Sequence, residues 1–201
     1  MIGKIFITSS GYDPEIGKHV KDPYLDNPPS LGACRPDIRR KLGVGDHVFV
    51  ISGKVRGAEQ FVMGGFEVAS KIDAVDAYNL FPERRLRLRD DGQLDGNIVV
   101  DEKGVRHALD THNPSPRAFA LRTKDYIIGT GLVSLAGPEE IARGRAQTLE
   151  FLCHLLNKHG YSPKEVVGRW GSDLSEEQVL QLRAWLRSLK RSDYAVTLKS
   201  Q

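Results

Sequence analysis

Cys34 has neighbours in the sequence that would make its thiol a better nucleophile. Arg35, Arg39 and Arg40 follow it in the run CRPDIRR, close to an expected helix start. Cations and a helix N-terminus lower the pKa of a thiol and favour the nucleophilic thiolate. His112 could then act as the base for this nucleophile. The interpretation that we favour is that Cys34 packs under a binding pocket while the arginines face the ligand.

The elements that position these residues follow from the run Ser30–Lys54, SLGACRPDIRRKLGVGDHVFVISGK. Pro36 suits the first turn of a helix, and Ile38 and Leu42 lie four apart, on one helical face. Two glycines then end the helix. The almost unbroken apolar run over residues 47–52 predicts a strand that is buried on both faces or central in a sheet.

The same run resembles the nucleotide-modification-associated domains, most nearly the second type. A Cys-x-Pro-x-Ile-Arg segment precedes Gly-Asp and a hydrophobic strand that ends in glycine, and its residues are Cys34, Pro36, Ile38, Arg39, Gly45, Asp46 and Gly53. Those domains are grouped with the PUA, ASCH and EVE domains, small β-barrels that bind modified bases in nucleic acid. The resemblance implies an α+β fold, with a PUA-like mixed β-barrel, short helices and a C-terminal helical segment.

Residues 1–136 are expected to form this barrel domain, with residues 137–201 as C-terminal helices packed on the same domain. Apolar strands at Lys4–Ser9 and Phe61–Lys71 should join the 47–52 strand in one closed or nearly closed sheet. Paired glycines in the middle of the 61–71 strand predict a bulge or a sharp bend. A further hairpin is expected from residues 97–100 and 105–109.

The C-terminal segment predicts two long helices. One runs over residues 138–159, and the other ends near Lys190 and begins with the capping box Ser175–Gln178. Trp170 lies between the two helices, with a glycine on either side of its Arg-Trp pair. We expect Trp170 to plug the helix junction; the alternative is that the glycines present its aromatic face.

The predicted ligand-binding residues lie at strand ends and in loops, and they are Ser9, Tyr12, Cys34, Arg35, Arg39, Gly53, Lys54, His112 and Asn113. Tyr12 could stack on a base or pin its loop to the barrel. The run from Asp110 to Asn113 could enter a pocket, or it could form a turn whose polar side chains cap the backbone. One histidine with one aspartate is too little for a metal site, so none is predicted.

A second predicted set contacts the nucleic-acid backbone, and its members are Arg40, Arg85, Arg87 and Arg89. The last three alternate, so they would line one face of an extended segment as a strip of phosphate contacts. The alternative is a solvated edge strand that is kept soluble by charge.

Arg35 and Arg39 lie four apart on the expected helix and can share a face. We expect Arg35 to face the nucleic-acid backbone. Arg39 is expected to point into the pocket or brace its wall; the alternative is a pairing with Asp37 or Asp46 that only holds the turn.

The chain has 201 residues, a formal net charge of +3 and 40% hydrophobic residues, which is a globular rather than a disordered composition. Two distant cysteines, Cys34 and Cys153, give no disulfide framework and favour a reducing compartment. No apolar run is long enough to cross a bilayer, and the opening segment MIGKIFITSS is too short and strand-like for a secretion signal. We therefore expect a soluble cytoplasmic protein with no membrane partner.

The strong catalytic motifs are missing from the sequence: it has no Walker loop, Gly-x-Ser-x-Gly, His-Glu-x-x-His or paired CxxC. We expect recognition of a modified nucleotide or base, in DNA, in RNA or free, without a cofactor. The first alternative is a small nucleotide- or base-modifying enzyme that uses Cys34 or His112. The second is an adaptor whose C-terminal helices bind a protein partner.

Overall fold

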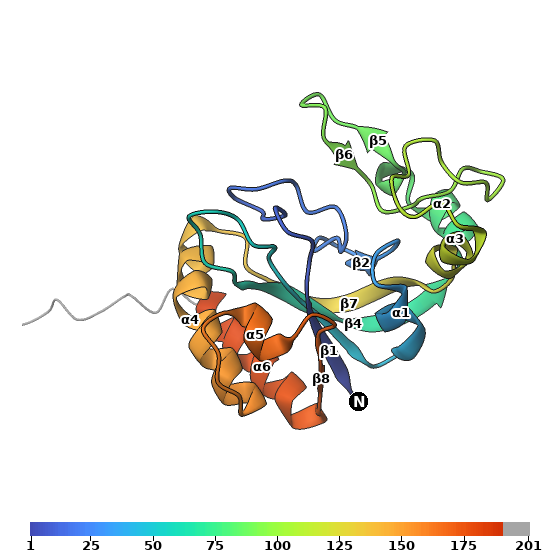
Figure 1. Cartoon of the computed structure of the whole chain (residues 1–201). Helices are drawn as coiled ribbons and strands as arrows, with labels where there is room; N and C mark the ends of the chain where they lie inside the picture. Colours follow the sequence, from blue (N-terminus) through green and yellow to red (C-terminus); the bar gives the residue numbers. More distant parts are fainter. Residues whose placement is uncertain (191–201) are drawn as a thin grey trace, which may run out of the picture.

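The fold is α+β and is organised around one curled sheet (Figure 1). The structure is a computed structural model, and it describes residues 1–190; residues 191–201 of the expected helical segment lie outside the described residues. The sheet has six strands in the order β2-β7-β4-β3-β1-β8, and their bounds are β1 Gly3–Ile7, β2 Ser30–Leu31, β3 His47–Ile51, β4 Val62–Ile72, β7 Tyr126–Ser134 and β8 Ser172–Leu174.

The three apolar strands predicted from the sequence lie side by side in this sheet, as expected. β1 pairs with β3 in parallel, and β3 pairs with β4 in antiparallel fashion. All five residues of β3 are buried, as the unbroken apolar run predicted. The sheet curls into half a barrel and does not close, because β2 and β8 are its two edges.

The predicted irregularity of β4 is confirmed. Its pairing with β7 shifts register between Gly65 and Glu67 and again between Val68 and Ser70. Shifts of this kind bend a strand and increase its twist. They allow the long strands β4 and β7 to wrap around the core.

Helices α4 (Pro138–Leu156), α5 (Pro163–Val167) and α6 (Glu176–Lys190) lie together on one side of the sheet (Figure 1). Thr148 of α4 accepts a hydrogen bond from the backbone N–H of Val62 at 3.1 Å, which joins this layer to β4. The capping box is confirmed: Ser175 and Gln178 exchange backbone and side-chain hydrogen bonds. The strand β8, which the sequence did not predict, runs antiparallel to β1. No helix of residues 1–190 is long and apolar enough to span a membrane.

The chain between β4 and β7 forms an arm that projects from the other end of the sheet (Figure 1). Its elements are α2 (Ala74–Leu80), the short helix η1 (Pro82–Arg84), β5 (Arg87–Leu88), β6 (Leu94–Asp95) and α3 (Pro116–Thr123). The predicted hairpin over 97–100 and 105–109 is present in a shorter form: the chain turns at residues 101–104, and one antiparallel bridge joins Val100 and Arg106. Ile98 and Val100 pack against α2 and Tyr126 in a small second core.

Candidate functional site

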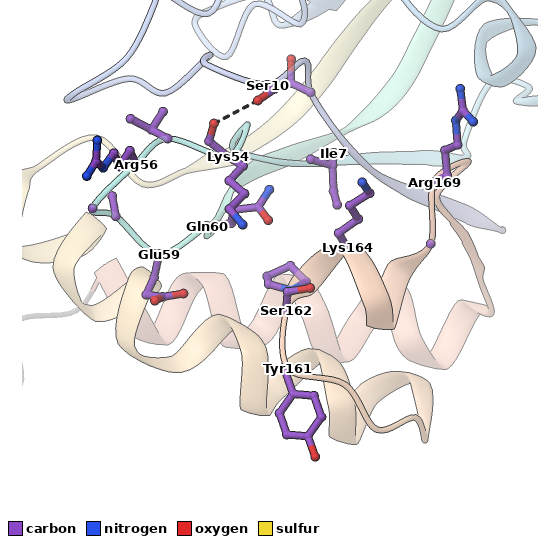
Figure 2. A pocket seen from close by; sticks show the side chains of 16 residues that line it. Ile7, Ser10, Lys54, Arg56, Glu59, Gln60, Tyr161, Ser162, Lys164 and Arg169 are labelled. Carbon is purple, nitrogen blue, oxygen red and sulfur yellow. Dashed lines mark hydrogen bonds between the residues drawn. The ribbon is translucent and has the colours of Figure 1, made fainter.

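A cleft of about 830 Å³ opens at the carboxyl ends of the parallel strands β1 and β3. One wall consists of Ile7, Thr8, Ser10 and residues 54–60, at and after the ends of these two strands, and the other consists of residues 161–164 and 168–169 around α5 (Figure 2). The carboxyl ends of parallel strands are a preferred ligand position in open sheets. The volume falls in the range of about 300–1,000 Å³ that is typical of small-molecule sites.

The strand wall is rigid because the loops after β1 and β3 are bonded to each other. Ser10 donates its hydroxyl to the carbonyl oxygen of Lys54 at 3.2 Å, and the N–H of Gly53 donates to the carbonyl oxygen of Tyr12 at 2.7 Å. A Cβ on Gly53 would collide with the backbone of Ser9, so only glycine allows this approach. Of the predicted ligand residues, Lys54 lines the cleft, whereas Ser9, Tyr12 and Gly53 build the wall behind it.

The helix wall is fixed by local caps. The hydroxyl of Ser162 accepts the N–H of Glu165 at 3.3 Å, and the carboxylate of Glu165 accepts the N–H of Tyr161 at 2.7 Å. Buried Pro163 holds the first turn of α5 in place. The side chain of Tyr161 is 95% exposed and points away from the cleft (Figure 2).

Four cations and one carboxylate line the cleft. Lys54 and Lys164 extend into it from opposite walls, and Arg56 and Arg169 lie at its two ends (Figure 2). Within residues 1–190, none of these four side chains makes an ion pair or a hydrogen bond; Arg169 lies 5.3 Å from the ring centroid of Trp170. The single acidic lining residue is Glu59. The cleft therefore carries an excess of positive charge that the described protein itself leaves uncompensated.

Trp170 does not plug the helix junction, because 68% of its surface is exposed. Its backbone is nevertheless docked: Arg35 donates to the carbonyl oxygen of Trp170 at 2.6 Å. A Cβ on Gly171 would collide with the carbonyl oxygen of Ile5, so the loop lies tight against β1. The close approach of the backbone leaves the indole on the outside, beside Arg169.

Arg35 is not available as the predicted contact to the nucleic-acid backbone. Its guanidinium makes two hydrogen bonds to Asp37, at 3.0 and 2.7 Å, and stacks over Phe6 at 5.1 Å. The same ion pair lowers the pKa of the Asp37 carboxyl. Arg35 is therefore neutralised by its neighbour and ties the start of α1 (Pro36–Lys41) to the Trp170 loop.

Arg39 is fully buried, with 0% of its surface exposed, and does not reach a ligand pocket. Its guanidinium donates to five backbone carbonyl oxygens, those of Ala33, Cys34, Arg122, Lys124 and Asp125. The alternative pairing with Asp37 or Asp46 is wrong as well, because Asp46 accepts the backbone N–H groups of Ile2 and Gly43. Arg39 joins α1 to the end of α3 and the start of β7.

Cys34 and His112 lie around a second, much smaller cavity of about 10 Å³, which is room for about one water molecule. The Nδ1 atom of His112 lies 2.6 Å from Oδ1 of Asp110, which orients the ring. Burial raises the pKa of the Cys34 thiol, and the Asp22 carboxylate raises it further. The thiolate alternative is therefore not supported, because Asp22 lies against Cys34 while the guanidinium of Arg39 is turned toward carbonyl oxygens.

Asn113, predicted beside His112, lies in an exposed turn. Its side chain accepts the N–H of Ser115 at 3.0 Å, and its carbonyl oxygen accepts a hydrogen bond from Arg122. This arrangement matches the alternative in which polar side chains of the 110–113 run cap the backbone.

The arginine strip lies on the arm, and none of its residues lines the cleft. Arg87 pairs with Asp95 at 2.6 Å, and Arg89 lies 3.5 Å from Asp91. Arg85 stacks on the ring of Tyr78 at 3.7 Å and donates to its carbonyl oxygen. The three arginines of the strip therefore each have a partner within the protein, and their contact with phosphate stays a prediction. Of the predicted backbone contacts, exposed Arg40 alone has no side-chain partner within the described residues.

No cluster of metal-binding side chains occurs among residues 1–190. Comparisons with protein-family models, with curated proteins and with solved structures found no match to this chain. The resemblance to the nucleotide-modification-associated domains therefore stays a prediction.

Proposed function

We propose that this chain recognises a nucleotide within nucleic acid and holds its phosphates in the cleft between the β1/β3 loops and α5. The observation that carries the proposal is the convergence of Lys54, Arg56, Lys164 and Arg169 on one cleft, where none of these side chains makes an ion pair or a hydrogen bond within residues 1–190. Most arginines near the predicted sites already bond to groups of the protein itself, and Arg35, Arg39 and Arg87 are examples. Cations that converge on a concave surface without partners raise the local concentration of anionic ligands.

The apolar part of the lining supports a ligand that is not phosphate alone. Ile7, Val55, Ala58 and Pro163 line the cleft between the charged side chains. Ligand sites combine apolar walls with a few polar groups that fix orientation. A nucleotide matches this mixture, with phosphates for the cations and a base or sugar for the apolar surface.

The lining supports binding rather than catalysis. It contains no histidine, cysteine or aspartate, and the amide of Gln60 is occupied by the carbonyl oxygen of Ser52 at 2.8 Å. The hydroxyls of Ser10 and Ser162 bond to backbone groups, and no basic side chain is hydrogen-bonded to a lining hydroxyl within the described residues. No nucleophile in the cleft is therefore paired with a base. The finer parts of the proposal, a PUA-like identity for the half-barrel and a modified base as the preferred ligand, rest on the sequence resemblance.

The test is fluorescence anisotropy with short labelled oligonucleotides that carry plain or modified bases, measured at several salt concentrations. For a single strand, each lost phosphate contact should reduce the magnitude of the salt slope by about 0.7. We expect Lys54→Ala and Lys164→Ala each to show this loss. Lys103→Ala, at an exposed lysine in the arm, is the matched control. Unchanged binding by the cleft variants would refute the proposal.

The enzyme alternative rests on one observation, the orientation of His112 by Asp110 at the rim of the cavity that Cys34 also lines. The neutral thiol and the size of that cavity, about 10 Å³, oppose it. The adaptor alternative lacks its expected apolar stripe, since the apolar residues of α6 at 179, 182, 186 and 189 are buried. Leu180 is the exposed leucine of that helix.

A further inference from the structure

We infer that the ligand is single-stranded nucleic acid and that one of its bases stacks on Trp170 while the neighbouring phosphates lie in the cleft. The inference rests on the proposed function and names the kind of nucleic acid. Single-stranded binding sites combine a basic groove with aromatic side chains on which bases stack. The cleft provides the first part, and Trp170 provides the second.

The loop that exposes Trp170 is held in place by hydrogen bonds to its backbone. Three hydrogen bonds hold the loop backbone: Arg35 to the carbonyl oxygen of Trp170, Lys4 to that of Gly171 at 3.4 Å, and the N–H of Gly171 to Gly168 at 3.2 Å. Within this rigid frame the indole keeps 68% of its surface exposed. A preorganised aromatic surface needs little ordering when a flat ligand binds.

The position of Trp170 links it to the cleft. Arg169 lines the cleft, and its guanidinium lies over one face of the indole, 5.3 Å from the ring centroid, so a base would stack on the other face. A cation for phosphate and a π-face for a base therefore lie next to each other at one end of the groove. Successive phosphates would continue past Lys164 and Lys54 toward Arg56 at the other end (Figure 2).

The two-walled groove favours a single strand over a duplex. Lys54 and Lys164 extend into the cleft from opposite walls, so a backbone bound there lies between the walls (Figure 2). A duplex keeps its bases paired and stacked inside, and it can place one on Trp170 only after flipping it out. A single strand presents its bases without that cost.

The direct test uses the fluorescence of Trp170. The chain contains two tryptophans, and Trp185 stacks on Phe151 with centroids 4.2 Å apart, so Trp185→Phe preserves a ring there. In this variant, oligothymidylate should quench the emission of Trp170 as it binds. Inorganic tripolyphosphate should compete for the cleft without quenching, because it has no base.

Fluorescence anisotropy of a labelled oligonucleotide is a second measurement, and it does not depend on Trp185→Phe. Trp170→Leu should weaken oligothymidylate binding between about fivefold and about a hundredfold. Trp170→Phe should retain most of the affinity, and Leu180→Ala, at an exposed leucine of α6 outside the cleft lining, should change nothing. A duplex of mixed sequence should bind more weakly than either of its strands.

The outcomes separate this inference from the proposed function. If oligothymidylate binds with the predicted salt slope but Trp170→Leu binds equally well, the inference is wrong and the cleft proposal stands. Equal or tighter binding of the duplex would also overturn the inference. If the oligonucleotide does not bind at all, both are wrong.

Discussion

The guanidinium of Arg35 donates to the carbonyl oxygen of Trp170 at 2.6 Å, across 135 positions of sequence. The same guanidinium pairs with Asp37 and stacks on Phe6, so its charge is compensated within the fold. Arg35 therefore acts as an anchor for the loop that carries Trp170. The relationship connects the start of α1 to one end of the cleft.

Arg35→Ala should loosen this loop and lower stability, by about 1–2 kcal/mol, because hydrogen bonds to a charged donor are lost. The salt slope of oligonucleotide binding should stay unchanged, because Arg35 does not contact phosphate in this account. Chemical denaturation and anisotropy on one preparation measure both quantities. Arg40→Ala, at an exposed arginine of the same helix, is the stability control. A smaller salt slope in Arg35→Ala would contradict the anchor role.

Arg39→Ala should destabilise the fold by about 3 kcal/mol or more, because several buried carbonyl oxygens would lose their donor at once. Arg39→Lys should rescue little, since an ammonium offers three donors without the planar fork of a guanidinium. Urea denaturation of both variants measures the loss. Ligand preference should not change in any variant that still folds; altered discrimination between plain and modified bases would return Arg39 to the binding site.

Stability should fall in mild acid because of His47. Burial lowers the pKa of His47 below its ordinary value of 6.5, Arg183 of α6 lowers it further, and Glu67 and Asp46 oppose the shift. Below pH 6.5 the unfolded chain therefore binds a proton at His47 that the native state does not yet bind. The contribution of neutral His47 to the free energy of unfolding is complete above pH 6.5 and is lost as the pH falls toward the native pKa.

Denaturation midpoints between pH 7.5 and 5 measure this effect, and His47→Gln should flatten the profile. If His47→Gln loses as much stability in acid as the parent does, other titratable groups cause the loss. His112→Gln, which replaces the histidine beside Asp110 in the small cavity, is the comparison variant.

Cys34→Ser should leave binding within a few-fold of the parent, because the buried thiol is neutral and lies outside the cleft. Native protein at pH 7 should react with iodoacetamide at Cys34 much more slowly than unfolded protein. Mass spectrometry of the labelled peptides reports the site. Rapid labelling of native Cys34, together with loss of function in the serine variant, would favour the enzyme alternative.

The helices and strands that depend on local signals were predictable from the sequence. Pro36 marked the start of α1, the apolar run marked β3, and Ser175 with Gln178 marked the cap of α6. Such signals act over a few residues, so a pattern is enough to detect them. The edge strand β8 has three residues and forms only by pairing with β1, so its sequence carried no comparable signal.

The chemistry of the arginines and of Cys34 was not predictable, because their partners are distant in sequence. Arg39 bonds to carbonyl oxygens 83 to 86 positions away, and Asp22 reaches Cys34 from 12 positions away. The cleft also depends on distant residues, since one wall comes from Ile7, Thr8, Ser10 and residues 54–60 and the other from residues 161–164 and 168–169. The sequence pointed to Lys54 as a ligand residue and to the Arg169–Trp170 pair, and Trp170 is exposed as in the alternative prediction rather than a plug.

Amide chemical shifts of labelled protein titrated with oligothymidylate show where nucleic acid binds. For binding in the cleft, the largest shifts should fall in residues 54–60 and 161–171, together with the indole N–H of Trp170. Residues of the arm and of the Cys34 cavity should stay unchanged and so serve as internal controls. Shifts that cluster around Cys34 and His112, with the cleft unaffected, would show that the nucleic acid binds elsewhere.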